Sequence, residues 1–365
     1  MVLTSRIFLC PDFQPRSTYR QEVIMTQMFM HNKFVSRVSD RFNRWAQMAY
    51  DGLISLVDFV FSPLQQGIGM KRMAYVFVLP NLAIFGIFIL FPMLLNFIYA
   101  FTQDPNFFLP DRAWIGTQNF NRLLTCQDFL QPGSCAEDLF WRSIYNTIQF
   151  VILQVGLMVL FSLITALILN RKIKARGFFR SVFFYPVLLS PVVVALLWKW
   201  ILQDNGLFNG VITSLGFPSV PFMTDPTWAR FWVIMISTWS NMGFYTLILL
   251  AGLQSIPTEM YEAARMDGAT DFQLFQKIVL PMLMPTMLVV LVLSLIRAVQ
   301  VFDVVYAFTG GGPGSATLYI VQYIYRNGFS SPVKQFGLAA AASLLMAIVL
   351  VVLTLAQLKL RNEEA

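Results

Sequence analysis

Six apolar runs, each long enough to cross a membrane as a helix, constrain the fold of this chain more than any other feature. They cover approximately residues 74–101, 143–169, 181–202, 228–253, 278–301 and 336–358 of 365. A bilayer core of about 30 Å needs about 20 mainly apolar residues in each helical span. Barrel strands are about half that length and alternate apolar with polar residues, which these runs do not. The sequence therefore predicts an all-α membrane protein with six transmembrane helices.

Prolines interrupt three of these runs. A transmembrane helix tolerates proline because neighbouring helices can satisfy the freed carbonyl groups. We therefore expect kinks, rather than breaks, at these positions: Pro80, Pro92, Pro186, Pro191, Pro281 and Pro285.

Basic residues indicate the orientation of the chain. Five of them and no acid lie between the second and third runs: Arg171, Lys172, Lys174, Arg176 and Arg180. Lys71 and Arg72 precede the first run, whereas the next connections on the other side are acidic on balance. Because basic loops stay in the cytoplasm, both termini are predicted to be cytoplasmic. The formal charge of +7 then reflects topology and gives no support to nucleic-acid binding.

Two cysteines lie in the first outer loop. Cys126 and Cys135 are on the oxidising side of the predicted topology, whereas Cys10 falls in the cytoplasmic tail. An even pair on that side predicts a disulfide, with two free thiols as the alternative.

The sequence lacks the usual marks of a catalytic subunit. No G-x-x-x-x-G-K-[ST] motif for nucleotide phosphates occurs, and no nucleophile motif is evident. The single histidine, His31, has no cluster of further ligands around it. We therefore predict no catalytic residue, no metal site and no cofactor in this chain.

Residues 1–72 are predicted to form a cytoplasmic tail without a signal peptide. Between residues 40 and 61, apolar residues recur at helical spacing, which predicts an amphipathic helix on the membrane surface. Packing of that helix on a partner subunit is the alternative. A later translation start also remains open, because internal methionines occur at Met25, Met28, Met30 and Met70.

A charged segment between the fourth and fifth runs, residues 255–277, predicts two short helices in the cytoplasm. Pro257 suits a first helical position, and Gly268 stands where a left-handed residue ends a helix. Thr270 and Gln273 form a capping-box pattern that begins a second helix. From these residues alone, a docking surface and an ordinary amphipathic loop remain equal interpretations.

The same segment resembles the EAA signature of bacterial binding-protein-dependent ABC importer permeases. Glu262-Ala263-Ala264 is followed by three residues, Gly268, nine residues and "IVLP". The stretches "IPTEMYEAARMDGAT", "FTGGGPG" and "FGLAAAASLL" resemble the sugar-importer, maltose-type branch. The resemblance covers residues 73–360, the predicted permease domain, and leaves 361–365 as a C-terminal tail.

This resemblance implies a type I permease fold in the bacterial inner membrane and several partners. They are a second, distinct permease chain, two cytoplasmic ATPase subunits, an extracytoplasmic binding protein and membrane lipid. It also implies that the charged segment couples to the ATPase through Glu262, Ala263, Ala264, Asp267, Gly268, Leu280 and Pro281.

Polar residues in the fourth and fifth runs are candidates for the solute pathway. Ser237, Ser240 and Asn241 share one helical face, as do Arg297, Gln300 and Val301. Hydrogen bonding between helices is the alternative role, worth about 1 kcal/mol per bond. The resemblance implies sugar contacts from these faces, although an arginine is a departure from a sugar-stacking aromatic.

The predicted function is that of a permease subunit that imports a mono- or oligosaccharide or a polyol. One alternative is the same architecture importing glycerol phosphate or another small solute, to which Arg297 points unless it pairs with Asp303. The alternative from another class is an ATP-independent secondary transporter. Such transporters commonly contain internal repeats, and none is evident here.

Overall fold

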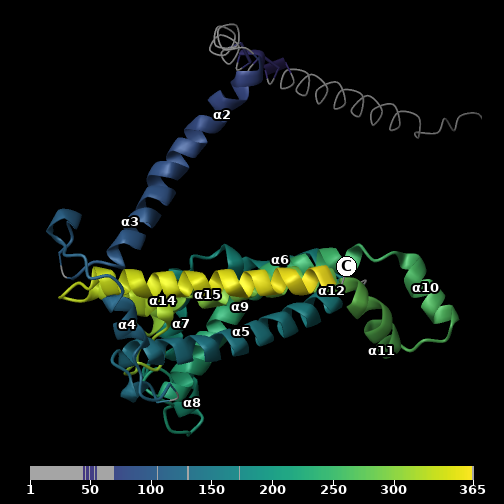
Figure 1. Ribbon diagram of the computed structural model, residues 1–365. Helices are drawn as coiled ribbons and strands as arrows, with labels where there is room; N and C mark the ends of the chain where they lie inside the picture. The colour runs from purple at the N-terminus through teal and green to yellow at the C-terminus, as the bar shows by residue number, and fades with distance from the viewer. Residues whose placement is uncertain are drawn as a thin grey trace, which may run out of the picture. The chain divides into compact units, whose positions relative to one another are not determined.

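The computed structural model describes residues 44–45, 47–48, 50–52, 54–55, 70–104, 106–129, 131–171 and 173–363 (Figure 1). Two compact units make up the chain, Met1–Leu90 and Phe91–Ala365. In the first unit, the described residues between Arg44 and Ser55 are helical, α2 covers Met70–Phe85 and the π-helix η1 covers Gly86–Leu90. Cys10, His31, the earlier internal methionines and the remainder of the predicted amphipathic helix lie outside the described residues.

The second unit is helical apart from isolated bridges and loops in the ranges described. Its elements are α3 (Phe91–Tyr99), α4 (Gln118–Leu124), α5 (Asp138–Asn170), α6 (Arg176–Phe184), η4 (Tyr185–Leu188), α7 (Pro191–Leu202), α8 (Leu207–Ser214), α9 (Pro226–Gln254), α10 (Thr258–Met266), α11 (Asp271–Leu274), η5 (Phe275–Val279), α12 (Leu280–Val299), α13 (Asp303–Phe308), α14 (Ile320–Tyr325), η6 (Arg326–Ser330) and α15 (Phe336–Glu363).

Among the described residues, five helical segments are long and apolar enough to cross a membrane. They are Phe77–Tyr99, Asp138–Asn170, Pro226–Gln254, Asp271–Val299 and Phe336–Gln357. A sixth span results if Arg176–Leu188 and Pro191–Ser214 are counted together.

The third predicted run is broken rather than kinked. Its two halves meet at 97°, so the expectation of one kinked helix over residues 181–202 is wrong. Pro186 has no N–H to donate, the backbone becomes extended at Leu189 and Ser190, and Pro191 occupies the first position of α7. Proline suits that first position because its N–H would be unpaired there in any case.

The core of the second unit lies around α5 and α9, which pack along one another and against α12. The Ser162 hydroxyl on α5 donates to the Met242 carbonyl on α9 at 3.2 Å. Gly243 lets α9 approach the backbone of α6 at Phe183, and Gly252 lets it approach Thr286 of α12. Small residues at such contacts are typical of helix packing in membranes, where close backbone approach is a main source of attraction.

Polar interactions hold the predicted outer end of the unit together. Cys126 and Cys135 form the expected disulfide. Asp104 accepts from the N–H groups of Gly337 and Leu338, at 2.7 and 3.3 Å, where α15 begins, and pairs with the buried Arg112 at 3.1 Å. A carboxylate at a helix N-terminus satisfies unpaired N–H groups and favours the helix dipole.

The two ends of this unit are distinct in Figure 1. Helices α4 and α8 lie at one end, and α10 and α11 lie at the other, beside the C-terminal end of α15. The charged segment and the disulfide-bonded loop are therefore on opposite sides of the apolar helices, as the predicted topology requires.

Candidate functional site

A cavity of about 390 Å³ opens among α5, α9, α12 and the residues that follow α12. Its walls include five of the six residues predicted for the solute pathway: Ser237, Asn241, Arg297, Gln300 and Val301. Residues from two runs that are far apart in the sequence therefore meet at one cavity, because α9 and α12 pack side by side.

Ser240, the sixth predicted residue, supports the cavity from behind. Its hydroxyl donates to the Ser237 carbonyl at 3.2 Å and accepts from the Asn241 amide at 3.0 Å. The same Asn241 nitrogen donates to the Ser237 carbonyl at 2.9 Å. These bonds hold the Asn241 side chain in one orientation toward the cavity.

Two buried polar atoms in the cavity wall have no hydrogen-bond partner among the described residues. They are Ser237 Oγ and Gln154 Oε1. Buried polar groups are nearly always paired, and leaving one unpaired costs about 1–3 kcal/mol. Both atoms are buried in this structure, so a solute hydroxyl would reach them only if the neighbouring side chains moved.

Charges of both signs line the cavity. Arg297 is exposed in this chain, and Asp303 lies in the same wall. No salt bridge joins these two residues in the part of the chain that the structure describes. The predicted alternative of an Arg297–Asp303 pair is thus absent, and the guanidinium is free to bind a solute.

Sequence reasoning missed other residues of the wall. Gln154, Tyr245 and Phe302 all line the cavity. The sequence did contain a sign that Gln154 has a special role, because it is the sole amide in the apolar stretch from Phe150 to Val159. The structure shows which face of α5 it occupies.

The cytoplasmic segment folds as two short helices separated by a sharp turn, as predicted. Helix α10 ends at Met266 with Asp267 as its C-cap, and Gly268 takes a left-handed conformation with φ of 76°. Thr270 Oγ1 accepts from the Gln273 N–H at 3.3 Å, and Gln273 Oε1 accepts from the Thr270 N–H at 2.9 Å. This capping box begins α11, which continues through η5 into α12.

The signature residues divide between the surface of this loop and its core. Glu262, Ala263, Asp267 and Gly268 are exposed, as is Pro281, whereas Leu280 is half-buried. Ala264 is buried with Leu274 and Val279, so of the two signature alanines it does not lie on the surface of the loop. Helical periodicity points neighbouring residues in different directions, and only Ala263 faces outward.

Exposed apolar residues join these charges on the loop surface. Met266 is 88% exposed and Phe272 is 72% exposed, and Met260 is also exposed. The burial of the Tyr261 ring against the loop core raises the pKa of its phenol. A mixed surface of this kind, rimmed by acids, is typical of a protein interface.

One helix links the two sites. The loop runs through η5 into α12, and Arg297 lies near the opposite end of α12. Twenty residues of α-helix extend about 30 Å, which is the thickness of a membrane core. Helix α12 therefore connects the loop to the cavity wall.

Membrane-spanning helices around a polar cavity, joined to an exposed loop with charged and apolar side chains, are typical of a membrane permease. The family model described as "Binding-protein-dependent transport system inner membrane component" matches residues 158–361, and the chain belongs to this family. It is a multi-pass inner membrane protein and a transport component of an ABC importer.

Alignments with similar proteins cover most of the chain. The trehalose/maltose transport system permease protein MalF of Thermococcus litoralis is 33% identical over 79% of this chain and 93% of its own length. The lactose transport system permease protein LacF of Rhizobium radiobacter is 32% identical over 78% of this chain and 92% of its own.

A solved structure also has a similar fold. It is described as a bacterial ABC transporter involved in the import of the acidic polysaccharide alginate. The match has a TM-score of 0.67 and 27% identity, and covers 82% of this chain and 99% of that one.

Proposed function

We propose that this permease imports a carbohydrate, a mono- or oligosaccharide or a polyol, and forms half of its path across the membrane. The polar cavity within apolar helices carries this proposal. A saccharide offers many hydroxyls for Asn241, Arg297 and Gln300, and its C–H faces can pack on the Phe302 ring. Relatives named for trehalose/maltose, lactose and arabinooligosaccharides support this solute class.

The cavity is incomplete in one chain, which supports a second permease subunit. Arg297 and Gln300 line the polar cavity and are exposed in this chain. Ionisable groups at membrane depth face a cavity or a partner. We infer that a second permease, a different chain by the habit of the family, closes the cavity from the other side.

The cytoplasmic loop is the proposed contact for one of the two ATPase subunits of the complex. The loop surface around the exposed Met266 carries two acids, Glu262 and Asp267. It also carries two small residues, Ala263 and Gly268, over which a partner can approach closely. Closure of an ATPase dimer would move this loop, and α12 would transmit that movement as a rigid body. An extracytoplasmic binding protein delivers the solute, and the permease itself catalyses no reaction.

Uptake into proteoliposomes by the complete complex tests this proposal. The panel contains labelled mono- and disaccharides and glycerol phosphate, with and without ATP. The informative variant is Gly268→Asp, because a Cβ there meets nothing within 4 Å in this chain. Gly216→Asp is the matched control, since Gly216 has a similar φ of 85° and equally open surroundings on the opposite side.

We expect ATP-dependent uptake of a saccharide that Gly268→Asp abolishes and Gly216→Asp retains. Strain at a left-handed residue costs both variants about 1–2 kcal/mol. Only a partner at Gly268 accounts for a difference between them. Uptake that persists without ATP would return the protein to the secondary-transporter class, and uptake of glycerol phosphate alone would change the solute class.

A further inference from the structure

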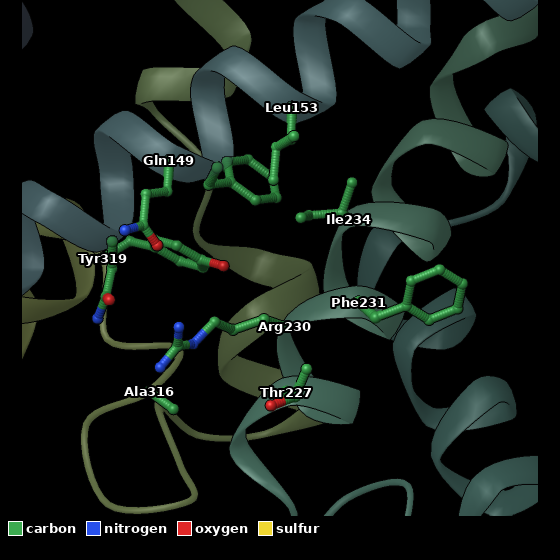
Figure 2. A pocket seen from close by; sticks show the side chains of 10 residues that line it. Gln149, Leu153, Thr227, Arg230, Phe231, Ile234, Ala316 and Tyr319 are labelled. Atoms are coloured by element: carbon green, nitrogen blue, oxygen red, sulfur yellow. The ribbon is translucent and has the colours of Figure 1, made fainter.

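A second pocket of about 270 Å³ lies between α5, the beginning of α9 and the segment before α14 (Figure 2). Its wall is mainly apolar, with Phe150, Leu153, Phe231 and Ile234. Arg230 projects into it, and Figure 2 shows its guanidinium facing Tyr319 and the Gln149 carboxamide. None of the residues predicted for the solute pathway lines this pocket.

The guanidinium of Arg230 has no hydrogen-bond or ion-pair partner among the described residues. The carboxylate of Asp225, the nearest acid along the chain, accepts hydrogen bonds from backbone groups instead. Its Oδ1 accepts from the N–H groups of Thr227 and Trp228, at 2.8 and 3.0 Å, and so caps α9. Arg230 is exposed, so its guanidinium at the pocket is accessible to an anion arriving from outside.

The wall of the pocket is held in place before any ligand arrives. Asn146 Nδ2 donates to the carbonyls of Ser315 and Leu318, at 2.7 and 3.1 Å, and so ties the segment before α14 to α5. The Phe150 and Tyr319 rings pack with centroids 4.8 Å apart. Burial raises the pKa of Tyr319, so its hydroxyl stays protonated and able to donate at neutral pH.

The pocket lies along the same face of α9 as the solute cavity. Thr227, Arg230 and Ile234 line the outer pocket, and Ser237 and Asn241 continue the same face of α9 into the cavity. Seven residues separate Arg230 from Ser237, a rise of about 10 Å. Phe150 lines both spaces and therefore stands between them.

We propose that this outer pocket is a second solute site, which binds the carboxylate of an acidic saccharide through Arg230 before the solute passes Phe150. The inference rests on the proposed function and names its substrate class. Arginine binds carboxylates through two parallel N–H donors, a geometry that lysine does not reproduce. The pocket's apolar wall suits the C–H face of a sugar ring, and Gln149, Thr227 and Tyr319 are within its polar rim.

The test compares digalacturonate and maltose as labelled solutes for the complete complex in proteoliposomes. Arg230→Gln removes the charge, and Arg326→Gln is the control, because Arg326 follows α14 on the same predicted side and lines neither pocket. We expect Arg230→Gln to raise the digalacturonate concentration for half-maximal uptake about tenfold or more, the loss expected for hydrogen bonds to a charged group. Maltose uptake and the control should change less than about twofold on that same scale.

A labelling experiment gives a direct measure of occupancy. Thr227→Cys places a thiol in the pocket beside Arg230, where an impermeant anionic thiosulfonate applied from outside should react. Digalacturonate should slow that reaction, and maltose at equal concentration should not.

Several results would overturn the outer site. One is maltose uptake by wild type with no digalacturonate uptake, and another is equal loss of both solutes in Arg230→Gln. Loss that depends on anionic lipid in the liposomes would assign Arg230 to a lipid phosphate, and loss of the second permease from the complex would assign it to a subunit interface. No uptake of any saccharide by wild type would overturn the proposed function together with the site.

Discussion

The contact between α9 and α6 gives a sharp prediction about packing. Gly243 lies where α9 meets the carbonyl group of Phe183, and a methyl group at Gly243 would overlap that oxygen. The same methyl would lie 2.9 Å from Phe184 Cα. Carbon atoms pack at about 3.5 Å or more, so the two helices must separate by roughly 0.6 Å or more.

The expected cost of Gly243→Ala follows from that overlap. Overpacking a well-packed core costs about 1–3 kcal/mol, and here the obstacle is backbone, which cannot rotate aside. Replacing glycine by alanine in a helix returns about 0.5–1 kcal/mol. Because a backbone obstacle places this overlap at the upper end of the overpacking range, the net destabilisation is about 2 kcal/mol. It should lower the unfolding midpoint by about 4–6 °C, given a few degrees per kcal/mol in a chain of this size.

Thermal unfolding of the purified complex in detergent measures this change. Gly156→Ala on α5 is the matched control, because a methyl group there meets nothing within 4 Å. That variant should unfold at the wild-type temperature or slightly above it. The separation of α6 from α9 should also reduce uptake, because α6 leads to Pro191 in the cavity wall.

An equal midpoint for Gly243→Ala and Gly156→Ala would refute the packing argument. A lower midpoint with unchanged uptake would leave the packing argument intact. It would refute the idea that the α6–α9 contact positions Pro191 in the cavity wall.

Three further predictions concern the cap, the cavity and the disulfide. Asp225→Ala removes the side-chain cap of α9 and should lower the free energy of unfolding by about 1 kcal/mol, whereas Asp225→Asn should retain most of it; equal unfolding midpoints for the two would contradict this. Asn241→Ala removes a cavity amide and should raise the half-maximal saccharide concentration about fivefold, with the ATPase rate of the complex unchanged; wild-type uptake kinetics would assign Asn241 to packing alone. Replacing Cys126 and Cys135 by serine should destabilise the outer loop by about 2.5 kcal/mol, measured as faster proteolysis from outside; an unchanged cleavage rate would refute this.

Sequence alone determined those features that depend on neighbours in the chain. Apolar runs of about 20 residues predict membrane helices wherever they occur, since the bilayer requires every backbone group to be paired within the segment. The turn at Gly268 and the capping box of Thr270 and Gln273 are likewise local, and the structure contains both. The spacing of the EAA signature is also a property of the chain, and the family match confirms the resemblance.

Tertiary structure decided which faces of these helices meet. Helical periodicity groups residues on one face but does not say what that face contacts, so only the packing of α5 on α9 shows that Gln154 lies in the cavity. The prolines of the third run indicated a kink, but the 97° bend depends on how α6 and α7 pack on α9. Ala264 is buried and Ala263 exposed because the loop folds onto its own core. Arg230 gains significance only where α9, α5 and the segment before α14 form one pocket, because which residues line a pocket is a property of the folded chain.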